Sequence, residues 1–415
     1  MKTKSRPWVM LIAIVAGFIS CAKDEATEEL VDDADSEYVI DSSLVKAPQN
    51  EHLVSRQQAI GNASVFLQEF QKFIYPEVPK EVASVIPFTK HNLHMTRAAK
   101  EKDDTLFYAI NYKDNRGFVL ASADDRLTPV LAYIDHGNYS ADDTTNVGFN
   151  MFLNNIINKY YRRSDKSLLR GNERNVGMSN GSEMIYQLLY TDWGPMPPFN
   201  RYFKEGMMTE RCIALGQICV NMRRPAVFAY KEKIITPQWN TIRQKLIYNN
   251  GVLDPDGKEA DQMAMLMASF SEKVPDELTY MCKDSYLAHL LVMGFDVKEV
   301  SHGRIDDPEY IWALRKRCLI YATGVAWRYS GQSAIYTDRH AWVIDGFFYA
   351  ENGDVKGTYL HCNWGMSGDK NGYFLCNGFD SDDIPDIDYG DSVKKVSYEG
   401  GCYSYHSCFG IVSPK

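Results

Sequence analysis

The stretch ERCIALGQICVNMRRP, residues 210–225, decides how the rest of the chain is interpreted. Its apolar residues recur at helical spacing and Pro225 follows as a stop signal, so the pattern predicts a buried helix. The N-terminus of a helix favours a cysteine nucleophile, because its free amide groups and dipole stabilise a thiolate. Cys212 and Cys219 are the thiols here, and neither stands at the first helical position.

The composition predicts a globular protein with more than one core. Of the 415 residues, 45% are apolar and 13% aromatic, which is enough for two or three domains of ordinary size. The net charge of -9 provides no basic surface for a phosphate backbone, so nucleic acid is not expected as a partner.

The start of the chain indicates export. A basic segment precedes an apolar run over residues 7–19, which is too short to span a bilayer. The run ends at Cys21 in a context that resembles a bacterial lipobox, which implies cleavage and lipidation there. An ordinary cleaved signal with an incidental cysteine is the alternative. We expect a lipoprotein signal over residues 1–21, a flexible acidic tether over 22–50, and anchoring by lipid in the bacterial outer membrane or at the cell surface.

Residues 51–163 are predicted to form a small α+β domain without a catalytic constellation. Apolar residues recur at helical spacing over residues 59–74 and 149–161. Between these helices, β-rich runs cover residues 105–112, 117–122 and 130–134.

The following segment, residues 164–182, is charged and rich in Gly, Ser and Asn, so it is either a linker that a protease can reach or a structured surface loop. Residues 183–415 form the second predicted domain. Its first part favours helices over residues 211–222, 240–248, 262–270 and 285–293. Its last part favours strands over residues 341–344, 357–362, 373–376 and 408–412. Helices followed by an antiparallel sheet predict an α+β domain of two layers with a cleft between them.

His340 is the candidate partner for a thiolate, because it begins an apolar strand and would project at the strand's edge. The loop that opens at Asn363 and Trp364 offers a carboxamide to orient that imidazole and an indole to shield the hydrogen bond. A histidine before a strand is also common as a purely structural residue.

The cysteines permit other interpretations. Apart from Cys21, all of them follow residue 210. Cys362, Cys402, His406 and Cys408 could be read as a metal cluster, but no pair has the short spacing typical of zinc sites. Buried thiols or disulfides of unknown pairing are the alternatives, and we expect neither metal nor cofactor.

Five motifs in this order resemble the streptopain family of papain-like cysteine peptidases with its inhibitory propeptide. They are GFVLASADDRLTPVLAY (117–133), TDWGPMPPFN (191–200), ALGQICVNMRRP (214–225), HAWVIDG (340–346) and HCNWGMSGDKNGYF (361–374). The resemblance implies a propeptide-like first domain, a papain-like second domain, and cysteine endopeptidase chemistry on a peptide or protein held in the cleft. It assigns His340, Asn363 and Trp364 to the family's catalytic histidine, asparagine and tryptophan.

The resemblance also exposes departures from the family pattern. An ungapped alignment of the helix puts Glu210 at the nucleophile position and leaves Cys212 further along. Pro195 stands where the family has the glutamine that helps to hold the oxyanion, and Met366 and Ser367 replace a tryptophan and a glycine. From Glu210 to Cys212 a helix turns by about 200° and rises roughly 3 Å, so Cys212 would face away from His340 unless the first turn shifts.

Two hypotheses follow from these departures. The first is a pseudopeptidase that keeps the cleft as a binding surface, with Glu210 stabilising the helix start or pairing with a protonated His340. The second is a secreted endopeptidase, made as a zymogen, that uses Cys212 and His340 with Asn363 and Trp364 in support. Loss of one oxyanion donor typically costs about a hundred- to a thousandfold in turnover, which favours the first.

Overall fold

The computed structural model describes residues 52–74, 79–89, 105–142, 145–162, 181–203, 208–272, 285–300, 308–330, 333–379 and 402–415. Residues 51–415 form one compact unit. The predicted signal and tether, residues 1–50, lie outside the described residues, and so does the predicted linker except for its end at Gly181 and Ser182.

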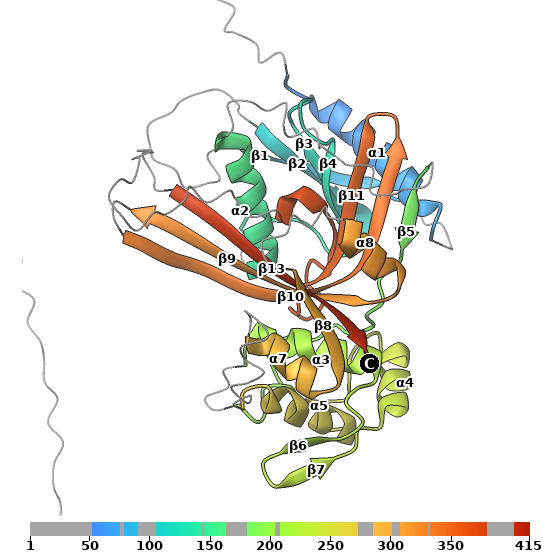
Figure 1. Cartoon of the computed structure of the whole chain (residues 1–415). Helices are drawn as coiled ribbons and strands as arrows, with labels where there is room; N and C mark the ends of the chain where they lie inside the picture. The colour runs from blue at the N-terminus through green and yellow to red at the C-terminus, as the bar shows by residue number, and fades with distance from the viewer. Residues whose placement is uncertain are drawn as a thin grey trace, which may run out of the picture. The chain divides into compact units, whose positions relative to one another are not determined.

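A single antiparallel sheet runs through this unit (Figure 1), with the strand order β1-β2-β3-β4-β12-β11-β10-β9-β13-β8 and with β5 paired to β10. Its strands are β1 (Val82–Thr89), β2 (Thr105–Tyr112), β3 (Phe118–Ser122), β4 (Val130–Ile134), β5 (Glu183–Ile185), β8 (Phe295–Val300), β9 (Leu319–Ser330), β10 (Ser333–Asn352), β11 (Val355–Asn363), β12 (Gly372–Leu375) and β13 (Cys402–Pro414). Strands β1 to β4 come from the first part of the chain, so the β4–β12 pairing fuses both predicted domains into one sheet.

Helices α1 (Arg56–Gln71) and α2 (Val147–Arg162) belong to the first part of the chain. Helix α1 begins with a capping box, in which the Ser55 side chain accepts from the amide of Gln58 and the Gln58 side chain accepts from the amide of Ser55. Phe66 and Phe70 of α1 bury their rings among Tyr133, Phe348 and neighbouring aromatic side chains. Aromatic packing therefore holds α1 against strands from both parts of the chain.

The second part of the chain begins with a helical layer, which Figure 1 draws below the sheet. It contains α3 (Glu210–Met222), α4 (Trp239–Tyr248), α5 (Lys258–Ser269), α7 (Ser285–Val292) and the hairpin of β6 (Phe228–Tyr230) with β7 (Lys233–Ile235). Helix α8 (Pro308–Arg315) precedes β9, and short 3-10 turns cover Lys113–Asn115 and Cys376–Phe379. Gly216 lets α3 approach α5 closely, because a Cβ at this position would lie 2.6 Å from the Met267 methyl carbon.

Two hydrophobic cores share the middle strands of the sheet. On β10, Trp342 and Ile344 enter the core formed with α1, α2 and the first strands. Ala341 and Val343, the alternate positions, enter the core of the helical layer. Because side chains alternate across a strand, both faces of β10 are buried over residues 341–344, where its sequence is a continuous apolar run.

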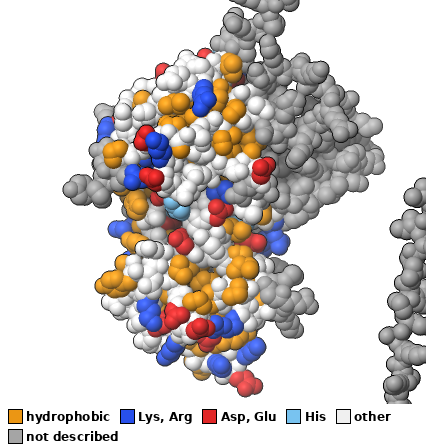
Figure 2. Space-filling view, turned by 180° about the vertical axis from the view of Figure 1, so that it is seen from behind, with side chains coloured by type: hydrophobic (Ala, Val, Ile, Leu, Met, Phe, Trp, Pro, Cys, Tyr) orange, Lys and Arg blue, Asp and Glu red, His pale blue; other side chains and the backbone are white. Residues whose placement is uncertain are grey.

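The α+β class and the order of helices before strands are confirmed by these elements. The predicted helices of the second domain match α3, α4, α5 and α7 closely, whereas β10 is far longer than the predicted run over 341–344. Among the described helices, none has the length and apolar character needed to cross a membrane. On the face drawn in Figure 2, basic and acidic side chains are interspersed.

Candidate active site

Helix α3 is the element on which a nucleophile would stand. Thr209 is its N-cap, and Arg223 ends it in the left-handed conformation shortly before Pro225. From Cys212 to Val220 the side chains of α3 are buried, so most of the helix is core and its half-buried residues lie at the two ends, with Glu210 in the first turn.

The thiol of Cys212 points into the core of the helical layer. The residue has no exposed surface, and its sulfur lies 3.4 Å from the hydroxyl of Thr209. Burial is the main reason that the pKa of Cys212 is raised to about 11; the hydrogen bonds of Thr209 and the Arg211 charge act against this rise, and the Glu210 carboxylate adds to it. A thiol in this state is almost entirely protonated at neutral pH and is a poor nucleophile.

His340 lies on β10 and is buried. Its Nε2 lies 2.8 Å from the main-chain oxygen of Trp364, and because a carbonyl only accepts, Nε2 carries the proton. Nδ1 has no hydrogen-bond partner, so the ring does not hydrogen-bond to the Cys212 sulfur. Burial lowers the pKa of His340, and the Trp364 carbonyl and the Glu210 charge oppose this only in part. The imidazole is therefore neutral at pH 7.

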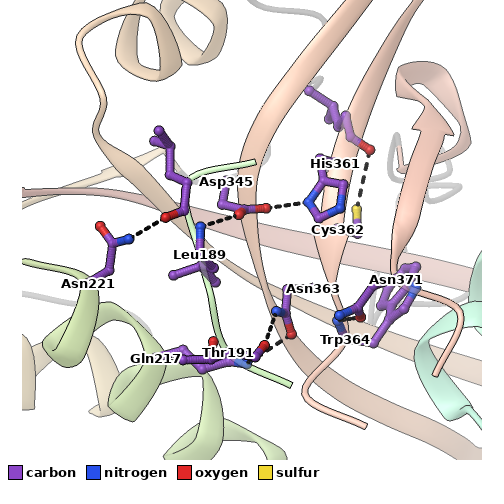
Figure 3. Close-up of polar contacts among 12 residues, drawn as sticks. Leu189, Thr191, Gln217, Asn221, Asp345, His361, Cys362, Asn363, Trp364 and Asn371 are labelled. Atoms are coloured by element: carbon purple, nitrogen blue, oxygen red, sulfur yellow. Dashed lines mark hydrogen bonds and ion pairs between the residues drawn. The ribbon is translucent and has the colours of Figure 1, made fainter. Parts of the chain in front are cut away.

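Asn363 is held by residues other than the histidine (Figure 3). Its Oδ1 accepts from Nε2 of Gln217 at 2.9 Å and from the amide of Gly365 at 3.1 Å. Its Nδ2 donates to the main-chain oxygen of Thr191 at 2.8 Å. Asn363 thus ties α3 to the segment over residues 186–193, which we call the crossing segment, and it leaves orientation of His340 to the Trp364 carbonyl.

Trp364 and Pro195 complete the set of predicted site residues. The Trp364 indole is buried beside the His340 ring, and its Nε1 donates to the Lys370 carbonyl at 2.9 Å. Pro195 lies half-buried after Gly194, in the segment that follows the crossing segment. Proline has no amide proton, so this position supplies neither a side-chain nor a main-chain donor to an oxyanion.

The first domain covers His340 directly. Asn146 precedes α2, accepts from the amide of Phe149 at 3.0 Å, and donates to the Asp369 carbonyl at 2.6 Å. At Gly148 a Cβ would lie 2.3 Å from Cε3 of Trp364 and 2.6 Å from Cδ2 of His340. The start of α2 therefore packs against both site residues with no room for a side chain.

A carboxylate–imidazole pair that was not predicted from the sequence lies on the strands that carry His340 and Asn363. Nδ1 of His361 lies 2.5 Å from Oδ1 of Asp345, and Oδ2 of Asp345 accepts from the amide of Leu189 at 2.7 Å (Figure 3). The Leu188 amide donates to the Asp345 main-chain oxygen at 3.0 Å. The signals in the sequence were Asp345 within the apolar run that follows His340, and His361 shortly before Asn363, on two strands that pair at this point in the sheet. The pair fixes the crossing segment to the sheet.

The structure therefore packs the Trp364 indole beside the His340 ring, with the Glu210 charge near enough to act on the imidazole, whereas the Cys212 sulfur makes no hydrogen bond to that ring. Among the described residues, no group of His, Cys, Asp and Glu could hold a metal ion. Cys212, Cys219, Cys318 and Cys362 are free thiols. The side chains of Cys402, His406 and Cys408 lie outside the described residues, so the cluster considered from the sequence has no structural account.

Comparison with known proteins identifies the first domain. Residues 51–160 match the family model described as Spi protease inhibitor, which confirms the predicted streptopain-inhibitor-like domain. Among solved structures, the chain is similar to a fragment of Prevotella intermedia prointerpain A that carries a cysteine-to-alanine substitution. The identity is 19%, with 69% of this chain and 93% of that chain covered, and the TM-score is 0.47. No curated protein sequence matched the chain.

Proposed function

We propose that this chain is an exported pseudopeptidase of the streptopain type, with a Spi-type first domain and a papain-like second domain that no longer performs thiol chemistry. The observation that carries the proposal is that the thiol and the imidazole are not hydrogen-bonded to each other. The Cys212 sulfur contacts the Thr209 hydroxyl inside the core, while Nδ1 of His340 has no hydrogen-bond partner. Activation of a cysteine nucleophile requires the two within hydrogen-bond reach.

Two further features support the loss of thiol chemistry. Glu210 stands where the accessible first turn of α3 would present a nucleophile, and a carboxylate there has no thiolate reactivity. Pro195 contributes no donor to an oxyanion. What such a protein retains is the capacity to hold a protein segment near His340, and the start of α2 occupies that place here. A peptide or protein ligand would have to displace α2 to reach it.

The test is labelling of each cysteine by an alkylating peptide probe, read by mass spectrometry, before and after cleavage of residues 164–180. Cys219 is the matched control, because it is a buried thiol of the same helix. We expect Cys212 to react as slowly as Cys219, with or without cleavage, and with no change in His340→Ala. His340-dependent labelling of Cys212 would establish the zymogen alternative instead.

A gain-of-function variant sharpens this test. Glu210→Cys puts a thiol at the accessible first turn of α3, where the amide groups of the helix start lower a thiol pKa. We expect the new cysteine to become the fastest-labelled one, and to lose part of that rate when His340→Ala is added. Equal rates with and without His340 would show that the imidazole does not reach this position.

Export and anchoring are part of the proposal. The apolar run over residues 7–19 and the lipobox-like context of Cys21 support cleavage before Cys21 and lipidation of its thiol. Metabolic labelling with an alkyne fatty acid tests this: incorporation is expected in the wild type, and Cys21→Ser is expected to abolish it and to release the protein from the membrane fraction. Labelling that persists in Cys21→Ser would exclude this site.

A further inference from the structure

The face between the first domain and the rest of the chain combines sheet pairing with buried aromatic side chains. Strand β4 pairs with β12 in the register Gly372↔Ile134, Tyr373↔Tyr133 and Phe374↔Ala132. The ring of Phe66 lies 4.9 Å from that of Tyr359, and the ring of Phe70 lies 4.9 Å from that of Tyr373. Main-chain ladders and desolvated aromatic anchors are features of stable interfaces.

At the edge of this face, a buried carboxylate of the first domain receives donors from both sides. Glu69 of α1 is buried, and its Oε1 accepts from Lys72 at 2.6 Å and from Nδ2 of Asn352 at 2.8 Å. Its Oε2 accepts from the hydroxyl of Ser182 at 2.9 Å. Burial raises the pKa of Glu69, but these hydrogen bonds outweigh burial and hold the pKa below its ordinary value. Glu69 is therefore an ionised, fully engaged group.

The last two residues of the predicted linker and the strand that follows them are held by the second part of the chain. The Glu351 amide donates to the Ser182 hydroxyl at 3.0 Å, and the Gly181 amide donates to the Glu351 carboxylate at 3.0 Å. Strand β5 then pairs with β10, and Arg315 binds the Glu183 carboxylate through Nε at 2.8 Å and Nη2 at 2.6 Å. Cleavage before Gly181 would leave every one of these contacts intact.

We infer that the Spi-type domain stays bound as a noncovalent subunit for hours after the linker is cut, held by the hydrogen bonds of Glu69 to Ser182 and Asn352, which we call the latch. Separation of the two parts would strip Ser182 and Asn352 from a buried carboxylate and would expose Phe66 and Phe70 to water. A hydrogen bond to a charged group contributes enough to change an equilibrium constant by about tenfold or more. The inference goes beyond the proposed function and does not depend on the reactivity of Cys212.

The experiment uses the full chain with a recognition sequence for a site-specific protease in place of residues 168–175 and a C-terminal tag. After cleavage, the protein is immobilised through the tag and washed, and the amount of the small fragment that remains is followed over time. We expect retention over hours for the wild type. Glu69→Gln should release the fragment at least about tenfold faster. The NH2 group of glutamine would face a donor that now hydrogen-bonds to a carboxylate oxygen, so that hydrogen bond would be lost.

Glu81→Gln is the matched control, because Glu81 is an exposed carboxylate of the same domain whose ion pair, with Lys113, stays within that domain. We expect it to leave release unchanged. Ser182→Ala removes the donor on the other side of the latch and should also speed release, which covers the case that Glu69→Gln folds poorly. Prompt release from the wild type, or equal rates for the Glu69 and Glu81 variants, would overturn the inference. Prompt release with unreactive Cys212 would overturn the latch alone and leave the pseudopeptidase intact.

Discussion

Gly148→Ala probes the contact between the first domain and the candidate site. The added methyl would lie 2.3 Å from Trp364 and 2.6 Å from His340, closer than carbon atoms approach, and both rings are buried. Overpacking of this kind typically costs about 1–3 kcal/mol. Alanine is favoured over glycine in a helix by about 0.5–1 kcal/mol, and the gain is smaller at the helix start. We expect the free energy of unfolding to fall by about 1–2 kcal/mol.

The control is Gly61→Ala in α1, another helix of the first domain, where a Cβ would meet nothing within 4 Å. This variant should gain about 0.5–1 kcal/mol, because only the helix preference acts. Urea unfolding of both variants, followed by circular dichroism at pH 7, measures the two changes. If Gly148→Ala gains stability as Gly61→Ala does, then α2 does not pack on His340 and Trp364 as described.

Two other predictions concern buried titratable groups. Burial against Phe270 and Tyr286 lowers the pKa of His289 to about 4. Between pH 6.5 and 4 the unfolded chain therefore binds a proton that the folded chain does not, so the free energy of unfolding falls as the pH falls through this window. His289→Phe should flatten the pH dependence of urea unfolding between pH 4.5 and 7.5, and an unchanged slope would assign that dependence to other groups. Asp345→Asn weakens a buried, charge-assisted contact to His361 and should cost roughly 2 kcal/mol in the same assay, whereas a neutral effect would show that the pair does not hold the crossing segment.

The sequence correctly predicted the elements that depend on the spacing of nearby apolar residues. The apolar spacing of α3 and the apolar runs around His340 and Asn363 located three elements of the site with their order in the chain. The extent of β10 was missed, because its polar ends continue a main-chain ladder that does not depend on side-chain polarity. The β4–β12 pairing was missed as well, since it joins residues that are far apart in the sequence.

Side-chain orientation within the site depends on contacts that no local pattern contains. The sequence suggested that Asn363 faces the imidazole, and in the structure its carboxamide is engaged by Gln217 and by the Thr191 carbonyl. Gln217 lies inside an apolar helix, and the sequence alone does not tell whether such a polar side chain hydrogen-bonds to another residue of the site or has no role there. Rotation along α3, by contrast, is fixed by helix geometry, and the thiol of Cys212 points into the core as that geometry requires.

The sharing of the middle strands between two cores has a consequence for how this protein can vary. On β9, Ile320 and Ala322 face the core of the first domain, while Leu319 and Tyr321 face the helical layer, and β10 repeats this alternation. Neighbouring residues along these strands therefore pack into different cores. A substitution at one of these positions can change the packing against the Spi-type domain without changing the packing against α3. The sequences of the two cores can therefore vary independently, although the same strands serve both.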